Sequence, residues 1–373
     1  MTCEYFGKCG SCTLYELDYD EQKKFKIEYM RELFGAFDIK EFEWRSSKKS
    51  HYRSRAEFMI YHNDDNISYA MHSLHEKLKL PIKQCPKTDE KIYDLMPKLL
   101  ACIEKNEILR KNLFSIEFLS SCDEILVSLL YHKKLDTIWE NAAKECADIL
   151  NVKLIGRSRN IKISINGDFV KERLDANGKR YFYNLHEGSF SQPNRGMNEQ
   201  MIEWILGRIL EAKRVDLLEL YCGHGNFTIP LAPLFEKVLA TEISKTSISA
   251  AKQNAALNST QNIEFARLSA EELTFALKGV REFKRLGGMN LFAYDFTHVL
   301  IDPPRAGLDG VSREFVKRFE NIIYISCNPQ TLERDLKEFV KTHKIAHFAL
   351  FDQFPYTRHI ESGVILHRLP SSK

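Results

Sequence analysis

The feature that most restricts the fold is a regular alternation of short apolar runs and helical stretches after residue 215. The runs are rich in β-branched residues and have the length of strands, and helical patterns separate most of them. They lie at residues 215–221, 237–243, 262–266, 298–302, 321–327 and 346–352. This rhythm predicts a doubly wound α/β domain whose mostly parallel sheet is buried on both faces. A last run at 363–367 follows too closely for a crossover helix, so we expect it to be antiparallel.

The part of the chain before residue 190 lacks that alternation. Helical stretches near 20–34 and 135–150 are mixed with strand-like runs such as 55–61 and 124–131. We therefore predict an N-terminal α+β domain over residues 1–190 and the α/β domain over residues 191–373, with an amphipathic helix at 196–214 leading into the first strand. A chain of 373 residues with 44% hydrophobic residues can build two such cores.

Membrane and secretory signals are missing from the sequence. No window approaches the ~18 apolar residues that a membrane span needs, and the first residues lack a basic and then apolar signal pattern. We expect a cytoplasmic monomer without a membrane partner. The net charge of +3 neither requires nor excludes a polyanionic partner.

A glycine-rich turn follows the first strand of the second domain. It reads Tyr221-Cys222-Gly223-His224-Gly225-Asn226, and the second strand ends about twenty residues later at Glu242. Glycines let backbone amides approach a ligand, and a carboxylate at this position can bind ribose hydroxyls. The third glycine of a dinucleotide-binding motif is absent, which favours S-adenosylmethionine over NAD. An ordinary turn with a solvated Glu242 is the alternative.

Two further strands end in polar motifs. The fourth ends in Asp302-Pro303-Pro304-Arg305 and the fifth in Ser326-Cys327-Asn328-Pro329. The carboxyl ends of neighbouring parallel strands meet at one edge of a sheet, so we expect Cys327 to lie near Asp302. A cysteine that closes a strand is more often a small buried apolar residue, but Pro329 stops the strand here and leaves the thiol at the ligand-binding edge.

These motifs, with Phe354-Pro355-Tyr356-Thr357-Arg358-His359-Ile360-Glu361, resemble the RNA uracil-5 methyltransferase family. Residues 189–194 and 279–283 are similar to the branch that methylates the T-loop uridine of transfer RNA. The resemblance implies a Rossmann-like class I methyltransferase domain behind an RNA-binding domain, with tRNA and not DNA as the partner and S-adenosylmethionine as the cofactor. It also implies that Cys327 is the nucleophile and Glu361 the proton acceptor. With Gly223 of the turn, the expected cofactor contacts are Gln192, Tyr221, Gly223, Asn226, Glu242 and Asp302.

The chemistry of uracil supports these residue types independently. Uracil C5 is a poor nucleophile until a group adds at C6 and turns the ring into an enolate. A thiolate suits that reversible addition, and a carboxylate can remove the C5 proton afterwards. An RNA-binding or iron-sulfur module without turnover is the alternative. The presence of both Cys327 and Glu361 favours the enzyme.

The N-terminus carries a compact cysteine pattern. Cys3, Cys9 and Cys12 lie within ten residues, and Cys85 is the best candidate for a fourth partner. Four such thiolates can hold a [4Fe-4S] cluster; zinc, or no metal at all, is the alternative. The pattern resembles the branch of the family that methylates 23S ribosomal RNA, in which such cysteines hold a cluster, so rRNA is the alternative substrate. The absence of that branch's additional N-terminal TRAM domain favours tRNA.

Residues 45–55 form the strongest local basic stretch, with five lysines and arginines in eleven residues. Charge runs are usually solvated surface. Interleaved serine and tyrosine side chains suit phosphate contacts and base stacking, so we predict that this stretch faces RNA.

Overall fold

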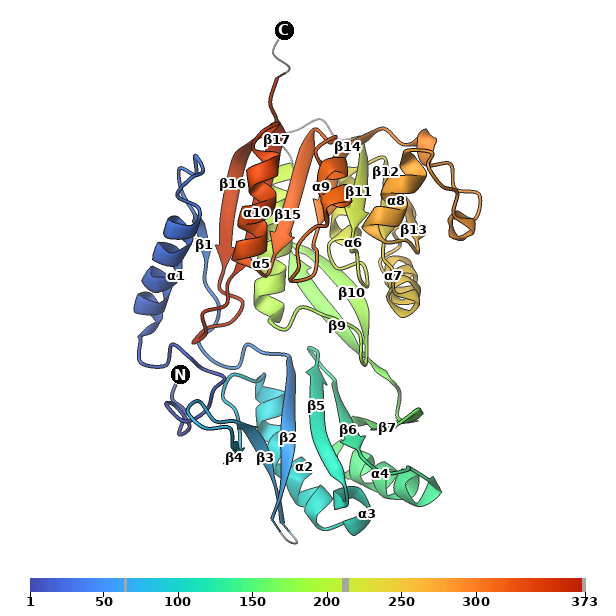
Figure 1. Ribbon diagram of the computed structural model, residues 1–373. Helices are drawn as coiled ribbons and strands as arrows, with labels where there is room; N and C mark the ends of the chain where they lie inside the picture. The colour runs from blue at the N-terminus through green and yellow to red at the C-terminus, as the bar shows by residue number, and fades with distance from the viewer. Residues whose placement is uncertain (64–65, 210–214, 371–373) are drawn as a thin grey trace.

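The computed structural model describes residues 1–63, 66–209 and 215–370, which form two sheet-containing units (Figure 1). Within these residues, no helix combines the length and the apolar character needed to cross a membrane. The carboxyl ends of the parallel strands in the upper unit of Figure 1 point toward the lower unit, so a ligand bound at those ends lies between the two.

The first unit is a seven-stranded sheet in the order β4-β3-β2-β5-β6-β7-β8, antiparallel except for the parallel pair β6 and β7. Its strands are β2 (Arg55–Asn63), β3 (Asn66–His72), β4 (Lys79–Ile82), β5 (Leu113–Ser120), β6 (Ile125–Tyr131), β7 (Lys153–Ser158) and β8 (Ile161–Ile165). The helices that pack on one of its faces are α2 (Glu90–Glu104), α3 (Glu107–Arg110) and α4 (Thr137–Leu150) (Figure 1). This mixture of strands and helices is the expected α+β arrangement.

The second unit is an eight-stranded sheet in the order β1-β16-β17-β15-β14-β11-β12-β13. Its strands are β1 (Glu43–Arg45), β11 (Asp216–Leu220), β12 (Lys237–Thr241), β13 (Ile263–Ala266), β14 (Phe296–Ile301), β15 (Asn321–Ser326), β16 (His343–Phe351) and β17 (Glu361–Arg368). Only β17 runs antiparallel to its neighbours, β15 and β16. The doubly wound α/β domain and the antiparallel last strand are thus confirmed.

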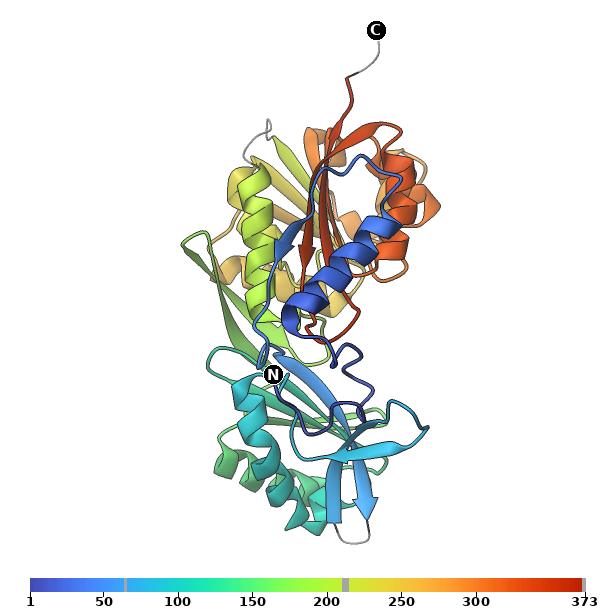
Figure 2. The ribbon, with the colours of Figure 1, turned by 90° about the vertical axis from the view of Figure 1, so that its left-hand side faces the viewer.

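Helices cover both faces of this sheet, which stands between α5 on one side and α1 with α10 on the other (Figure 2). The two layers consist of α5 (Arg195–Ile209), α6 (Thr228–Leu231) and α7 (Lys245–Leu257) on one face, and α1 (Tyr19–Leu33), α8 (Ala270–Leu277), α9 (Gly310–Val316) and α10 (Pro329–Phe339) on the other. Short 3-10 turns lie at Ala232–Leu234, Lys284–Leu286 and Leu291–Ala293. Helix α5 covers most of the helix expected at 196–214, and residues 210–214 lie outside the described residues.

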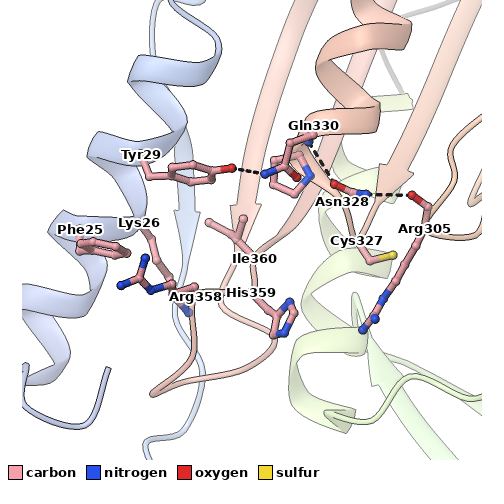
Figure 3. Close-up of a pocket in the computed structure, with 11 residues that line it drawn as sticks. Phe25, Lys26, Tyr29, Arg305, Cys327, Asn328, Gln330, Arg358, His359 and Ile360 are labelled. Atoms are coloured by element: carbon pink, nitrogen blue, oxygen red, sulfur yellow. Dashed lines mark hydrogen bonds between the residues drawn. The ribbon is translucent and has the colours of Figure 1, made fainter. Parts of the chain in front are cut away.

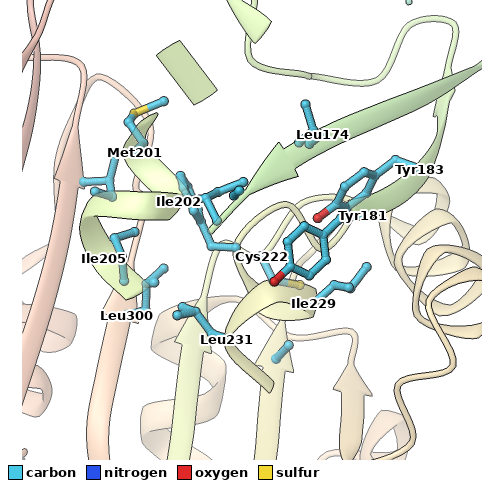
Figure 4. Packing of buried hydrophobic residues seen from close by; sticks show 14 of the residues in the cluster. Leu174, Tyr181, Tyr183, Met201, Ile202, Ile205, Cys222, Ile229, Leu231 and Leu300 are labelled. Atoms are coloured by element: carbon cyan, nitrogen blue, oxygen red, sulfur yellow. The ribbon is translucent and has the colours of Figure 1, made fainter. Parts of the chain in front are cut away.

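Burial on both faces explains why the strands of the second unit read as continuous apolar runs. In β11, Leu217 packs with the α5 layer whereas Leu218 packs with the α1 and α10 layer, and both are fully buried. Side chains alternate between the faces of a strand, so both faces demand apolar residues. Figure 4 shows the α5 side of this core, where Ile202 and Ile205 lie close to Leu300 of β14.

Some elements that precede residue 190 pack with the second sheet. Strand β1 pairs with β16, and Met30 of α1 is buried in the core beside α10. The hairpin of β9 (Phe169–Ala176) and β10 (Lys179–His186) contributes Tyr183 to the α5 core (Figure 4). The domain division at residue 190 stays a prediction. The chain begins beside β3 of the first unit, passes to the second unit at α1 and β1, returns to the first, and ends in the second.

Glycine substitutions give a test of the packing. A Cβ added at Gly156 of β7 would lie 2.2 Å from the ring of Trp139, which is buried in the first core. We expect Gly156→Ala to lower the free energy of unfolding by about 1–3 kcal/mol, because the ring and the strand must move apart. The measurement is urea denaturation of the full chain.

The control for this prediction is Gly207→Ala in α5. A Cβ at Gly207 would meet no atom within 4 Å. Alanine loses less backbone freedom than glycine in a helix, so this variant should be unchanged or more stable by about 0.5–1 kcal/mol. Equal stability of both variants would show that the Gly156–Trp139 contact is looser than described.

Candidate active site

Cys327 lies where β15 turns into α10. Strand β15 ends at Ser326, and Asn328 begins the helix, since its Oδ1 accepts a hydrogen bond from the backbone N–H of Gln330 at 3.1 Å. Pro329 occupies the first helical position, where its missing N–H costs nothing. The sequence therefore ends the strand abruptly and places the thiol at the amino-terminal end of a helix, where the helix dipole favours a negative charge.

Glu361 is the first residue of β17 and lies near Cys327. This strand lies beside β15, with Ser362 opposite Ser326, so Glu361 is next to the end of β15 that carries Cys327. The side chain is only 4% exposed. Burial, reinforced by the negative charge of Asp302 and opposed by Arg305, raises the pKa of Glu361 well above its usual range. The two residues expected to be catalytic are therefore neighbours.

The motif after β14 supplies the other charges of the site. Burial raises the pKa of Asp302 to about 7. The backbone carbonyl of Arg305 accepts hydrogen bonds from Asn328 Nδ2 at 2.9 Å and from Thr331 Oγ1 at 3.3 Å, which fixes this loop against the start of α10. Figure 3 shows the Arg305 side chain beside Cys327.

These neighbours set the protonation of the thiol. Burial is the largest cause that raises the pKa of Cys327, to about 11, and the charges of Glu361 and Asp302 add to it. Arg305 opposes them and lowers that pKa. A thiol with two carboxyl groups and one guanidinium around it can act as a nucleophile only when the negative charges near it are neutralised.

A cavity of about 490 Å³ opens beside Cys327 and extends to α1. Figure 3 shows Cys327 and Arg305 at one end, Phe25 and Arg358 at the other, and His359 between them. The charged residues that line it are Lys26, Arg305 and Arg358, and no carboxylate is among the described lining residues. Asp352 neutralises Lys26, so Arg305 and Arg358 are the charges in this lining that attract a polyanion such as RNA.

The expected cofactor residues gather at the carboxyl ends of β11 and β12. Tyr221 and Gly223 follow β11 with φ angles of +62° and +55°. Glu242 follows β12, and its carboxylate accepts hydrogen bonds from the N–H of Gly223 at 3.3 Å and of Ser244 at 2.8 Å. A Cβ at Gly223 would meet no atom within 4 Å, so the turn is open on that side.

Gln192 and Asn226 have different neighbours. Gln192 Oε1 accepts a hydrogen bond at 2.7 Å from Nε2 of Gln353, in the loop between β16 and β17. Asn226 and Asn198 of α5 exchange two hydrogen bonds of 2.8 Å through their amide groups. Gln192 is therefore linked to the loop that leads to Glu361, whereas the hydrogen bonds of the Asn226 amide go to α5.

Sequence reasoning assigned no role to Lys26. Its side chain is 2% exposed, its Nζ lies 2.5 Å from Asp352 Oδ1, and it donates to the carbonyl of Phe354 at 3.2 Å. The sequence contained one signal for its burial. Lys26 lies four residues from both Gln22 and Met30, and residues at this spacing share one face of α1, which is buried. Sequence reasoning named Arg305 only as part of the motif that begins at Asp302 and gave it no role of its own.

The basic stretch at 45–55 divides into two groups. The guanidinium of Arg53 lies 5.2 Å from the ring centre of Phe354, and Arg55 donates to the carbonyl of Ser189, so both hold the structure together. Lys48 and Lys49 are exposed. The RNA-facing role expected for the whole stretch stays a prediction, and these two lysines are its candidates.

Cys3, Cys9, Cys12 and Cys85 line one pocket although the sequence separates the last from the others. Lys87 reaches the same pocket, is 5% exposed, and donates from Nζ to Ser11 Oγ at 2.6 Å. Across residues 1–63, 66–209 and 215–370, no group of three or more histidine, cysteine, aspartate or glutamate side chains is arranged to hold a metal ion.

Comparisons with known proteins agree on one family. The sequence profile described as tRNA (Uracil-5-)-methyltransferase matches residues 18–369. A tRNA/tmRNA (uracil-C(5))-methyltransferase of a Nitratiruptor species is 52% identical over 99% of this chain and 100% of the relative. One of the same name from Aliarcobacter butzleri is 48% identical over 99% of this chain and 100% of the relative.

A solved structure supports the fold. The crystal structure of the Pyrococcus abyssi tRNA (uracil-54, C5)-methyltransferase in complex with S-adenosyl-L-homocysteine superposes with a TM-score of 0.72 at 24% identity. The match covers 95% of this chain and 85% of that chain. The arrangement of both units is therefore shared with that protein.

The reactivity of Cys327 tests the charges around it. Arg305→Gln removes the cation that stabilises the thiolate, so the pKa of Cys327 should rise and less thiolate should exist at any pH below it. We expect iodoacetamide to modify Cys327 about threefold to tenfold more slowly at pH 9, with the rate profile displaced to higher pH. Mass spectrometry of the peptide that contains Cys327 measures the rate, and Arg281→Gln, at an exposed position, is the control. An unchanged rate profile would show that Arg305 is too far from Cys327 to affect the pKa of its thiol.

Proposed function

Since this chain belongs to the tRNA (uracil-5-)-methyltransferase family, we propose that it transfers a methyl group from S-adenosylmethionine to C5 of the T-loop uridine of tRNA, forming 5-methyluridine. The observation that carries the proposal is the placement of Cys327 beside Glu361 at the ligand-binding edge of the sheet, next to a cationic cavity. The relatives are named for tRNA and tmRNA, so both RNAs are candidate substrates.

The residues at the ends of β11, β12 and β14 fit S-adenosylmethionine. Glu242 can accept hydrogen bonds from ribose hydroxyls beside the open turn at Gly223. Asp302 follows β14 at the same edge of the sheet, and burial raises the pKa of its carboxyl to about 7. Tyr221 directly follows β11 beside this turn. When bound, the cofactor supplies an electrophilic methyl group on a positively charged sulfur.

The reaction begins at Cys327. The thiolate forms a bond to uracil C6, and the electron pair of the C5–C6 double bond moves toward O4 to give an enolate with charge on C5. Arg305 supports this step because its positive charge favours the thiolate. C5 would then take the methyl group as the bond between the methyl carbon and the cofactor's sulfur breaks, with its electron pair left on the sulfur of S-adenosylhomocysteine. C5 would become tetrahedral while Cys327 stays attached to C6.

Glu361 completes the reaction. Its carboxylate takes the proton from C5, the electrons of the C–H bond restore the double bond, and the thiolate of Cys327 leaves C6. A carboxyl with a raised pKa holds a proton well once it has taken it, so the elevation of the pKa of Glu361 suits an acceptor. Cys327 thus acts in the first step of the covalent pathway and Glu361 in the last.

The substrate is tested by methylation with labelled S-adenosylmethionine. Separated tRNA, tmRNA and 23S rRNA are each incubated with the protein, and the methylated uridine is located by digestion and mass spectrometry. We expect 5-methyluridine in the T-loop of tRNA. Labelling of 23S rRNA alone would favour the ribosomal substrate, which the N-terminal cysteine pattern suggested. Activity as a cytoplasmic monomer that does not act on DNA stays a prediction.

The Glu361→Gln variant separates the two catalytic roles. Glutamine cannot accept the C5 proton, so the variant should add to uracil and methylate it, and then stall with the RNA still attached. We expect a protein-RNA complex that survives denaturing electrophoresis and carries the transferred methyl group.

Cys327→Ala provides the matched control. On its own it should bind RNA without forming the adduct, and in the Glu361→Gln background it should abolish the complex. Normal turnover by Glu361→Gln would remove the base from its assigned role. An adduct that persists in the double variant would show that another nucleophile is at work.

We also propose that Cys3, Cys9, Cys12 and Cys85 hold an iron-sulfur cluster. The support is their shared pocket, together with the buried cation of Lys87 beside it. Burial raises the pKa of Cys12 to about 11, and the charges of the other three cysteines add to it. If these cysteines are deprotonated, their charges would repel one another in this pocket, and the iron of a cluster would offset that charge.

The cluster is tested by colour and metal content. Protein purified without oxygen should be brown, with broad absorbance in the blue region of the visible spectrum and with iron and sulfide in equal amounts. Cys85→Ser should lose most of this absorbance, whereas Cys122→Ser, outside the pocket, should retain it. Colourless protein with bound zinc, or with no metal, would contradict the proposal.

A further inference from the structure

The loop from Asp352 to Ile360 connects β16 to β17 and ends directly at Glu361. The N-terminal part of the chain holds it from several sides. Lys26 pairs with Asp352 and donates to the carbonyl of Phe354, and Tyr52 donates from its hydroxyl to the carbonyl of Pro355 at 3.0 Å. The position of the expected base therefore depends on residues more than 300 positions away in the sequence.

Tyr356 is the centre of this attachment. Its N–H donates to Gln22 Oε1 at 2.7 Å, and its carbonyl accepts from the N–H of Leu14 at 3.0 Å. Its ring centre lies 5.6 Å from that of Phe6, and the residue is 5% exposed. The φ angle of +65° is unfavourable for a residue with a Cβ, so the surrounding contacts hold the backbone in this conformation.

Phe6 connects Tyr356 to the cysteine pocket. It lies between Cys3 and Cys9 in the sequence and lines the pocket that they share with Cys12 and Cys85. One ring therefore borders the pocket and packs on the loop before Glu361. Any change that disorders residues 3–12 removes a contact that keeps this loop in place.

We propose that Tyr356 is a positioning residue that ties the cysteine segment, residues 3–12, to the loop that carries Glu361. Order in this segment then sets how readily Glu361 takes the proton from C5. The inference rests on the proposed function, because it assigns the segment to the last step of that reaction. It predicts a defect in release of the RNA and not in addition of Cys327 to uracil.

Two substitutions loosen the contact from opposite sides. Tyr356→Gly removes the ring while glycine tolerates the φ angle and keeps both backbone hydrogen bonds. Phe6→Ala removes the partner ring. In each variant we expect kcat to fall about tenfold with KM for tRNA changed less than about twofold, and the methylated protein-RNA adduct to accumulate several-fold above wild type. Replacing Cys327 as well should abolish that adduct.

A second measurement follows the loop itself. Hydrogen exchange of the amides between 352 and 361, read by mass spectrometry on the RNA-free protein, should be faster in both variants. The matched control is Phe292→Ala, which removes an exposed ring in the 3-10 turn Leu291–Ala293, outside both residues 3–12 and the loop. This control should show wild-type exchange and wild-type adduct levels.

The outcomes separate this inference from the proposed function. If the wild-type protein methylates tRNA and Glu361→Gln traps the adduct, but Tyr356→Gly releases RNA at the wild-type rate, the positioning role of Tyr356 is wrong. The same conclusion follows if Phe292→Ala slows release equally, since the loop would then respond to a substitution outside both the loop and residues 3–12. A wild-type protein that methylates no RNA would overturn the proposed function, and this inference with it.

Discussion

Repulsion between buried negative charges is the constraint on which the site depends. Cys327, Glu361 and Asp302 lie together at one edge of the sheet, and burial and mutual repulsion raise the pKa of the thiol and of Glu361. Arg305 opposes this effect at both Cys327 and Glu361. A positively charged cofactor bound beside these groups would relieve this repulsion, which suits the role proposed for Cys327.

The sheet brings these groups together through its strand order. Asp302 and Cys327 follow adjacent parallel strands, β14 and β15, so they meet at one edge. Glu361 arrives from the other direction because β17 runs antiparallel between β15 and β16. The loop before it needs external support, and α1, the cysteine segment and Tyr52 supply that support. Elements that precede the first sheet thus stabilise the catalytic edge of the second.

Individual residues show which parts of the fold and of the site could be predicted from the sequence. The β-branched runs, buried on both faces, identified the strands from β11 to β16, and the short connection identified β17 as antiparallel. The sequence indicated Asp302, Cys327 and Glu361 because each stands in a motif at the end or start of a strand, and their roles stay predictions. Lys26 was missed because a lysine in an amphipathic helix normally points to water, and only the position of Asp352 explains its burial. The convergence of Cys85 with the three N-terminal cysteines was proposed from their number and spacing, and the structure places all four at one pocket.

The sequence by itself determined the alternation of strands and helices and the chemical groups at the strand ends, because both depend on residues that are close together in the chain. The tertiary structure decided which groups meet. Glu361 lies beside Cys327, and the amide of Asn226 bonds to Asn198. Arg53 and Arg55 make contacts within the protein, and α1 and β1 pack with the second unit. These outcomes depend on contacts between residues far apart in the chain, and the free energy of such contacts arises only when the packed core brings both partners together.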